Sequence, residues 1–188
     1  MNIEENNKTN EAVGRQMWDR WVSDVQEDPV IKLGKVNKLR IFVDMDGVIS
    51  DFKSEMDDYM LVNNLTKLHR PEMKIDFTKF KVMPGAKIAI QALEDLGHEV
   101  YIASTPPWDR PEVWGQKRDW ICKHFPSLKR KMFLTHRKDF LDGDILIDDT
   151  QYRGQPLFKG EWIHFGTDKR FLDWNMVLTY ITGSYEKV

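Results

Sequence analysis

Residues 41–52 read Ile-Phe-Val-Asp-Met-Asp-Gly-Val-Ile-Ser-Asp-Phe, and this stretch determines the fold class. Its apolar start predicts a buried strand that ends at Asp44, and open α/β folds bind ligands at the carboxyl ends of their strands. Asp46 follows closely, and Gly47 lets the backbone turn tightly. One carboxylate can attack phosphorus and bind a cation, while the other holds a proton for the leaving group. The pattern therefore indicates phosphoryl transfer; the alternative is a strand with an acidic turn, because Asp-Gly is a common turn pair.

Stretches with strand and helix patterns alternate along most of the chain. This alternation favours an α/β fold, in which a parallel sheet has helices on both faces. Residues 51–83 combine a helical pattern with a polar, proline-containing stretch, so we expect a small helical cap inserted there, after the first strand. The expected strands are 39–43, 99–103, 131–134, 144–147 and 162–165, and the expected helices are 51–65, a segment between Gly85 and Gly97, 111–125 and 171–181.

The chain is expected to divide into an N-terminal extension, residues 1–38, and a main domain, residues 39–188. Within the extension, apolar residues from Met17 to Val25 recur at helical spacing before Asp28-Pro29 ends the run, which predicts an amphipathic helix. The apolar face of this helix either covers the sheet or joins a second subunit. A homo-oligomer is therefore one of two open alternatives.

The composition suits one domain that acts on a small molecule. The 188 residues are 41% hydrophobic and 31% charged, which is enough for one core of ordinary size. A net charge of −2 argues against binding to duplex nucleic acid or to an anionic membrane. The polar N-terminus is unlike a signal peptide, and no apolar run approaches the ~18 residues that span a bilayer, so we expect a cytoplasmic protein. The single cysteine, Cys122, is predicted to be a small core residue on a helix.

Polar side chains also follow two later strands. Ser104 and Thr105 come after residues 99–103, where a hydroxyl group and backbone amides can bind phosphate oxygens. Lys138 comes after residues 131–134 and can neutralise the oxygens of a phosphoryl group. The alternative for Lys138 is a solvent-exposed lysine on a loop.

A pair of acids, Asp148 and Asp149, follows the apolar strand at 144–147. In a parallel sheet, these acids face the same edge as Asp44. Paired carboxylates at such an edge are costly unless a cation compensates their charge. Oxygen ligands from Asp44, Asp148 and water, completed by substrate phosphate, suit Mg²⁺, which is the expected cofactor.

Four motifs, in this chain order, resemble those of the haloacid dehalogenase (HAD) superfamily of phosphohydrolases: Asp44-Met45-Asp46-Gly47-Val48, Ser104-Thr105-Pro106, Lys138 and Asp148-Asp149. Two features narrow the resemblance to the 5′(3′)-deoxyribonucleotidases. One is the sequence of the first motif as far as Phe52, and the other is the spacing between Lys138 and Asp148. The resemblance spans residues 39–166. It implies a Rossmann-like core with a cap, Mg²⁺ dependence and hydrolysis of nucleoside monophosphates, so a small phosphate ester is the expected partner.

The same resemblance implies a role for each matching residue. Asp44 would be the nucleophile that forms an aspartyl-phosphate, and Asp46 would protonate the leaving hydroxyl and then activate water. Phosphate binding would come from Ser104, Lys138 and the amides of Met45, Asp46 and Thr105, and metal binding from Asp44, Asp148, Asp149 and the backbone carbonyl of Asp46.

Five aromatic residues are candidates for stacking on a base: Phe52, Tyr59, Phe77 and Phe80 in the cap, and Trp108 beside the phosphate-binding loop. For the cap residues, packing in the core is the alternative that we favour. The Pro-Pro-Trp-Asp setting of Trp108 favours exposure, so Trp108 is the preferred substrate contact.

Two other groups of residues receive structural interpretations. Lys117 and Arg118 form a basic pair on the helix expected at 111–125, a pattern more typical of a solvated face than of a phosphate clamp. The five histidines have no ligand spacing, so no zinc site is expected.

Three functions compete on this sequence. The preferred one is a Mg²⁺-dependent phosphomonoesterase that acts on (deoxy)nucleoside monophosphates. The second is a phosphatase for polynucleotide 3′-phosphate ends or for sugar phosphates, which a short cap admits more easily. The third is a catalytically idle nucleotide-binding subunit, and the intact acids and lysine argue against it because paired carboxylates are costly to keep.

Overall fold

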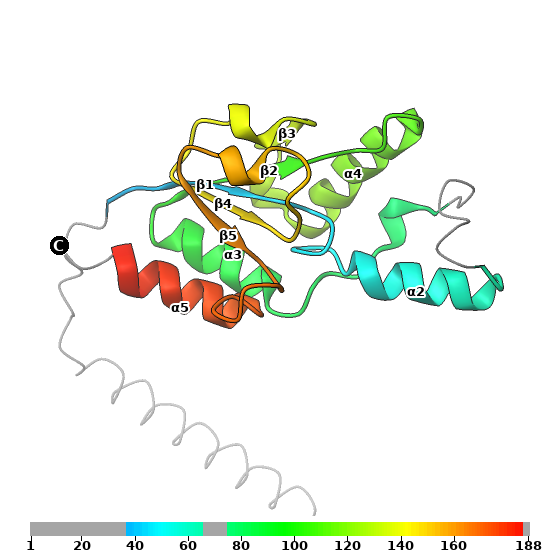
Figure 1. The fold of residues 1–188 in the computed structure, drawn as a ribbon, viewed down its shortest axis with the longest axis horizontal. Coiled ribbons are helices and arrows are strands. Elements are labelled where there is room, and N and C mark those ends of the chain that lie inside the picture. The colour runs from blue at the N-terminus through cyan, green and yellow to red at the C-terminus, as the bar shows by residue number, and fades with distance from the viewer. Residues whose placement is uncertain (1–36, 66–74, 186–188) are drawn as a thin grey trace, which may run out of the picture. The chain divides into compact units, whose positions relative to one another are not determined.

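A computed structural model describes residues 37–65 and 75–185 of the chain. The helix predicted within residues 1–38 lies outside these ranges. Within the described residues, five strands form a parallel sheet in the order β3-β2-β1-β4-β5 (Figure 1), which confirms the predicted α/β fold class. The strands are β1 (Arg40–Val43), β2 (Glu99–Ser104), β3 (Met132–Leu134), β4 (Ile145–Asp148) and β5 (Glu161–His164).

The register of the central strands brings the predicted motifs to one edge. Val43 of β1 pairs with Ile102 of β2 on one side and with Ile147 of β4 on the other. The backbone N–H of Asp44 donates to the carbonyl of Ile147, at 2.8 Å, so the ladder continues to the first residue of the motif. Because all these strands are parallel, their polar ends meet at the carboxyl edge.

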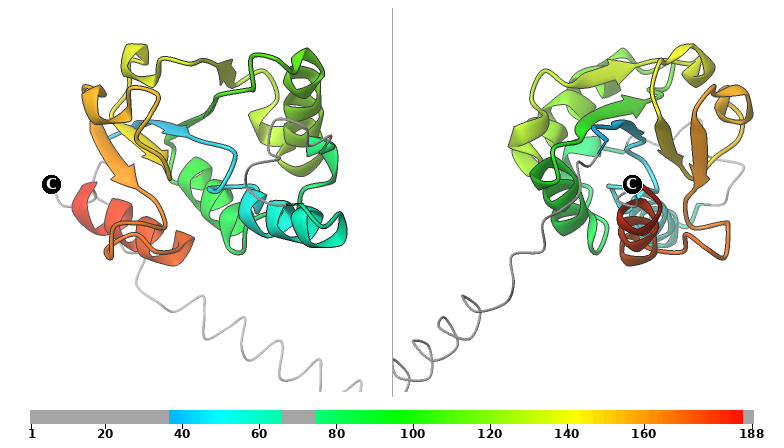
Figure 2. Two further views of the ribbon diagram at one scale, coloured as in Figure 1. Left: turned by 45° about the vertical axis from the view of Figure 1, so that its right-hand side comes forward. Right: turned by 90° about the vertical axis from the view of Figure 1, so that its left-hand side faces the viewer.

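The two faces of the sheet are covered differently. The α-helices α3 (Ala86–Asp95), α4 (Pro111–His124) and α5 (Trp174–Tyr185) pack against the face that presents Ile41 and Ile147, and α3 and α5 lie side by side there (Figures 1 and 2). The opposite face carries a smaller apolar cluster, which includes Phe42 and Leu146. Short 3₁₀ helices, η4 (Lys138–Phe140) and η5 (Gln155–Leu157), lie in the connections to that face. The helices expected on both faces are thus α-helices on one face and 3₁₀ helices on the other.

The prediction that Cys122 is a core residue is wrong, because its side chain is only partly buried. The buried stripe of α4 runs through Val113, Lys117, Trp120 and Ile121. Cys122 is one position beyond Ile121, and the 3.6-residue period of the helix turns it away from that stripe.

The segment expected to form the cap contains α2 (Phe52–Val62) and the 3₁₀ helix η2 (Phe77–Lys79). Its two ends lie side by side, since the N–H of Asp51 donates to the carbonyl of Lys81 at 2.9 Å, and the N–H of Met83 donates to the carbonyl of Ile49 at 2.8 Å. Paired ends of this kind are what an insertion into a continuous fold requires. The exact limits 51–83 remain a prediction.

Helix α4 holds the η2 segment in place. The indole N–H of Trp120 donates to the carbonyl of Phe80 at 2.7 Å, and the N–H of Phe77 donates to Oε1 of Gln116 at 3.2 Å. Arg110 donates to the carbonyl of Ile75 at 3.1 Å. Among residues 37–65 and 75–185, no helix has the length and apolar character needed to cross a bilayer.

Candidate active site

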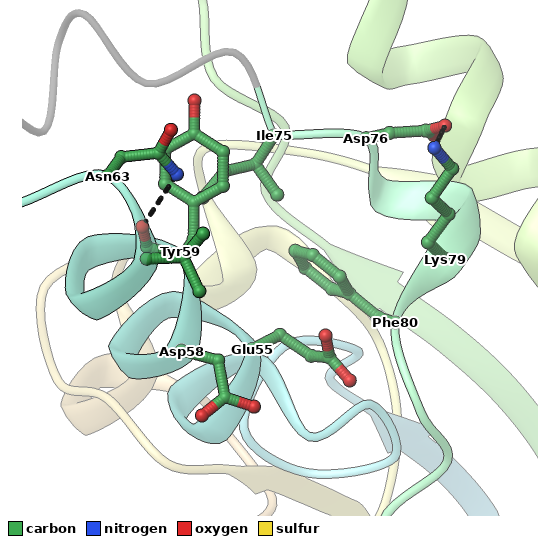
Figure 3. Close-up of a pocket in the computed structure, with 9 residues that line it drawn as sticks. Glu55, Asp58, Tyr59, Asn63, Ile75, Asp76, Lys79 and Phe80 are labelled. Atoms are coloured by element: carbon green, nitrogen blue, oxygen red, sulfur yellow. Dashed lines mark hydrogen bonds and ion pairs between the residues drawn. The ribbon is translucent and has the colours of Figure 1, made fainter.

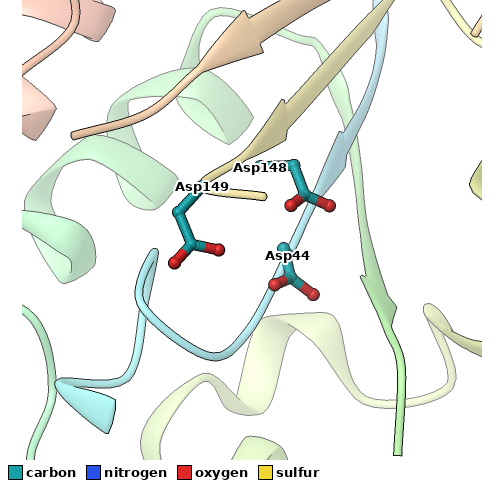
Figure 4. A group of neighbouring side chains, drawn as sticks. All are labelled: Asp44, Asp148 and Asp149. Atoms are coloured by element: carbon teal, nitrogen blue, oxygen red, sulfur yellow. The ribbon is translucent and has the colours of Figure 1, made fainter. Parts of the chain in front are cut away.

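Three carboxylates meet where β1 and β4 end. Asp44, Asp148 and Asp149 each offer an oxygen, and these oxygens lie within 4.8 Å of one another (Figure 4). Asp44 and Asp148 are buried, and Asp149 is partly buried. Negative charges this close in a low-dielectric site repel one another strongly, so the cluster requires positive charge nearby.

Lys138 supplies part of that charge from within the protein. Its side chain is buried, and Nζ lies 2.7 Å from Oδ1 of Asp44 and also forms an ion pair with Asp148. Burial alone would lower the pKa of Lys138, but Asp44 and Asp148 together outweigh that effect and the pKa is raised. Lys138 is therefore a charged member of the cluster, which excludes the solvent-exposed alternative.

One lysine does not compensate three carboxylates. Burial, opposed by Lys138 and reinforced by Asp148, raises the pKa of Asp44 to about 6. Burial and the neighbouring charges of Asp44 and Asp148 raise the pKa of Asp149 to about 7. Both shifts arise first from burial, which disfavours the charged carboxylates, and a bound cation would oppose that effect.

The donor set fits a hard divalent cation. Oδ1 of Asp149 is buried and accepts no hydrogen bond from any residue that the structure describes. Such an atom is costly unless it has a partner, and carboxylate oxygens are the ligands that Mg²⁺ and Ca²⁺ prefer. Asp44, Asp148 and Asp149 can therefore bind a metal, as the sequence predicts.

Asp148 is held by partners that the sequence analysis missed. Its Oδ1 accepts from the backbone N–H of Thr150 at 2.9 Å and from the Thr150 hydroxyl at 3.1 Å. Nε2 of the buried Gln155 donates to Oδ2 of Asp148 at 3.0 Å. Gln155 is one polar residue in a glycine- and proline-containing loop, and no sequence pattern distinguishes it.

The interpretation of Lys117 as a surface residue is wrong. Lys117 is completely buried, forms an ion pair with Asp46, and donates to the hydroxyl oxygen of Ser104 at 3.0 Å. Its Nζ also lies 5.0 Å from the centroid of the Phe77 ring. Lys117 thus joins the first motif, the second motif and the cap segment. Its neighbour Arg118 has a 70% exposed side chain, as expected of a solvated face.

A signal for Lys117 was present in the sequence. Lys117 lies four residues after Val113 and four before Ile121, so it belongs to the apolar stripe of the helix. A lysine on a buried stripe requires a carboxylate partner.

The loops after β2 and β3 are joined by hydrogen bonds. The hydroxyl of Thr105 donates to the carbonyl of Thr135 at 2.7 Å, and the N–H of Thr135 donates to the carbonyl of Ser104 at 3.0 Å. Ser104 is buried and Thr105 is partly buried. The structure thus brings Ser104 to Lys117 and Asp46, and Lys138 to Asp44 and Asp148.

The aromatic candidates have different surroundings. Phe77 and Phe80 are buried with ring centroids 4.7 Å apart, and Phe52 packs against both. These contacts are those of the packing alternative. Trp108, by contrast, is 75% exposed. Contact of any of these residues with a substrate remains a prediction.

A pocket of about 330 Å³ opens between α2 and the η2 segment (Figure 3). Tyr59 and Phe80 line it, which places two of the candidate residues at a cavity. Its other described walls include three acids and one lysine: Glu55, Asp58, Asp76 and Lys79.

The first motif can lie close to Asp149 because Gly47 has no side chain. Its φ is +80°, and a Cβ at this position would lie 2.2 Å from Oδ2 of Asp149. We expect Gly47→Ala to lower the free energy of unfolding by about 1–2 kcal/mol through the left-handed backbone alone, and to displace Asp149 and abolish activity. Gly97→Ala is the control, since Gly97 has a φ of +87° and no described atom within 4 Å of its Cβ position. Denaturant unfolding and phosphate release should show lost stability in both variants and lost activity only in Gly47→Ala; equal activities would contradict this account.

The raised pKa values predict how the stability of the metal-free protein depends on pH. Because the folded-state values of about 6 for Asp44 and about 7 for Asp149 exceed the ordinary value of 3.8, the folded state binds more protons between these limits. The contribution of these two groups to the free energy of unfolding is complete below pH 4, and it is lost as pH rises to about 7. Thermal unfolding in EDTA from pH 5 to 7.5 should show a smaller fall in Tm for Asp149→Asn than for the wild type. Parallel curves would contradict the shift assigned to Asp149.

A sheet of this order, with acids and a buried lysine at its carboxyl edge, defines a phosphohydrolase of the HAD type. The family model described as "5′ nucleotidase, deoxy (Pyrimidine), cytosolic type C protein" matches residues 63–178. The chain belongs to this family, which confirms the predicted resemblance and the predicted class of enzyme, a phosphoric monoester hydrolase.

Named relatives agree with this assignment. A putative 5′(3′)-deoxyribonucleotidase of Vibrio phage KVP40 is 36% identical over 156 residues, which cover 82% of this chain and 91% of the relative. The human cytosolic 5′(3′)-deoxyribonucleotidase is 28% identical over 148 residues, covering 62% of this chain and 74% of the relative. A putative 5′(3′)-deoxyribonucleotidase of Acanthamoeba polyphaga mimivirus is 28% identical over 141 residues, covering 60% and 64%.

Proposed function

We propose that this protein hydrolyses nucleoside monophosphates, with deoxynucleotides as the first substrates to test, through a covalent aspartyl-phosphate. The family and the names of the relatives support the substrate class. The observation that carries the mechanism is the cluster of the buried Asp44, Asp148 and Lys138 with the partly buried Asp149, which pairs a nucleophile with phosphate-binding charge. We retain the expectations of a cytoplasmic location and of no binding to duplex nucleic acid.

In the first step, a carboxylate oxygen of Asp44 attacks phosphorus, a new P–O bond forms, and the bond to the nucleoside oxygen breaks. Asp46 gives a proton to that leaving oxygen, so the nucleoside departs as an alcohol. Lys138 neutralises the phosphoryl oxygens as the negative charge moves, and Ser104 donates its hydroxyl hydrogen to one of them.

In the second step, Asp46 takes a proton from water, which attacks the phosphorus of the aspartyl-phosphate and regenerates Asp44. Lys117 positions Asp46 through the contact described above, as a hydrogen bond while Asp46 holds the proton and as an ion pair once Asp46 has given it up. Asp44, Asp148, Asp149 and the backbone carbonyl of Asp46 would hold Mg²⁺, which when bound stabilises negative charge on the phosphate oxygens.

A substrate panel tests the proposal. Phosphate release should be measured from 5′- and 3′-deoxynucleoside monophosphates, 3′-phosphorylated oligonucleotides and hexose phosphates, with Mg²⁺ and with EDTA. We expect Mg²⁺-dependent release with the highest kcat/KM for a mononucleotide. A higher kcat/KM for the oligonucleotide or for a hexose phosphate would show that the proposed substrate class is wrong. Nucleotide binding without turnover would support the alternative of a catalytically idle nucleotide-binding subunit.

A further inference from the structure

Gln155 is a buried amide beside the candidate active site, and the reaction described above gives it no role. Its side chain is buried at the start of η5, where a polar group is costly unless it has hydrogen-bond partners. Nε2 donates to Oδ2 of Asp148 at 3.0 Å and to the hydroxyl oxygen of Thr150 at 2.9 Å. Oε1 accepts from the backbone N–H of Arg153 at 2.6 Å. Because a backbone N–H can only donate, this last bond fixes the amide with Nε2 facing Asp148.

Gln155 and Thr150 hold the Asp148 carboxylate at both of its oxygens. Thr150 donates to Oδ1 through its backbone N–H and its hydroxyl, and Gln155 donates to Oδ2. A carboxylate that is held at one oxygen can still turn about its Cβ–Cγ bond, because the torsion at a planar end group is soft. The second point of attachment removes this freedom, so Gln155 determines where Oδ2 lies.

Lys138 depends on the same oxygen. Its Nζ donates to Oδ2 of Asp148 and lies 2.7 Å from Oδ1 of Asp44. The backbone N–H of Lys138 also donates to the carbonyl of Arg153 at 2.8 Å. The loop that carries Gln155 thus holds the backbone of Lys138 directly, and it holds the ammonium group through Asp148.

A purely structural role in closing the loop explains these contacts less well. The loop already packs tightly against η4, since Gly154 has a φ of +94° and a Cβ there would lie 2.1 Å from Oδ1 of Asp139. Closing the loop would also require bonds within it, such as the one from the Arg153 N–H. Both hydrogens on Nε2 of Gln155 instead go to Asp148 and to Thr150, which itself holds Asp148.

We propose that Gln155 is a positioning residue, which fixes the Asp148 carboxylate and, through it, the ammonium group of Lys138 beside the transferred phosphoryl group. This inference rests on the proposed nucleotidase function and adds the residue that positions its phosphate-neutralising lysine. Charge stabilises a transition state best when it is in place before the reaction begins. A displacement of about 1 Å can lower a rate by about 100-fold, so the support of Lys138 controls kcat.

The kinetic test uses Gln155→Met, which has a similar length but no donor, with Gln151→Met as the matched control on the same loop, where Gln151 is exposed. With saturating Mg²⁺ and a deoxynucleoside 5′-monophosphate, Gln155→Met should lower kcat by about 10- to 100-fold and change KM less, while Gln151→Met keeps wild-type values. Gln155→Asn repeats the test with an amide that is too short to keep both the Asp148 and the Arg153 contacts. Thermal unfolding verifies that each variant is folded, and wild-type kcat in a folded Gln155 variant would overturn the proposal.

A double-mutant cycle tests whether Gln155 acts through Lys138. If it does, adding Gln155→Met to Lys138→Met should change kcat by less than about twofold, because the group that Gln155 positions is already gone. Independent effects would multiply. A multiplied loss would show that Gln155 supports the loop alone, and it would overturn the proposal.

NMR of the metal-free protein separates failure of the proposal from failure of the nucleotidase function. With isotope-labelled lysine, the ammonium signal of Lys138 is assigned by its absence from Lys138→Met. This signal should be protected from solvent exchange in the wild type and in Gln151→Met, and Gln155→Met should lose the protection. Protection that is unchanged in Gln155→Met would overturn the proposal whatever the activities show. A wild type that hydrolyses no nucleotide would overturn the proposed function, while this signal still shows whether Gln155 positions Lys138.

Discussion

Asp44→Asn is expected to lower phosphate release from every active substrate by about 10³- to 10⁶-fold, the range seen when a catalytic nucleophile is removed. The amide cannot form the aspartyl-phosphate, and it also removes one carboxylate from the metal-binding cluster. Initial rates with Mg²⁺ measure the effect, and thermal unfolding verifies that the variant is folded.

Asp142→Asn is the matched control, because the Asp142 side chain is 97% exposed and pairs with Arg40 away from the cluster. It should keep wild-type activity. Wild-type rates in Asp44→Asn would contradict the assignment of Asp44 as nucleophile.

Lys117→Met is expected to have the second largest effect, a fall in kcat of about 10²- to 10³-fold together with lower stability. Methionine has a similar length but no charge, so Asp46 loses its ion pair and Ser104 loses a donor in a buried site. The steady-state kcat and KM, with Tm as the measure of stability, report both effects.

Arg118→Met provides the comparison on the same helix. Its side chain is 70% exposed and pairs with Asp119 at the surface, so the change in stability should stay within about 0.5 kcal/mol and kcat should be unchanged. Equal losses of kcat in Lys117→Met and Arg118→Met would show that the net charge of α4 controls the rate. That result would contradict a specific role for the contact of Lys117 with Asp46.

The residues at the strand ends could be predicted from the sequence, because all strands of a parallel sheet end at the same edge. Each apolar run ends near the carboxyl edge, so the positions of Asp44, Ser104 and Asp148 in the chain are enough to place them at one edge of the sheet. The lysine after β3 followed from the same rule, although its burial did not.

Contacts made across the fold were beyond the reach of the sequence. Lys117 was misjudged because basic residues on a helix are usually solvated, and only the packing of α4 against β2 and the cap shows its side chain between Asp46 and Ser104. Gln155 was missed because its role depends on where the loop after β4 returns to Asp148. The partial exposure of Cys122 and the use of 3₁₀ helices on one face likewise follow from tertiary packing.

The central claim is that this cluster of acids hydrolyses nucleoside monophosphates with a divalent cation. Its most direct test is the rate of phosphate release from a deoxynucleoside 5′-monophosphate by the full-length protein, with Mg²⁺ and then with excess EDTA. We expect turnover with Mg²⁺ that EDTA abolishes and added Mg²⁺ restores. Tight binding of the nucleotide in Mg²⁺ without release of phosphate would contradict the claim.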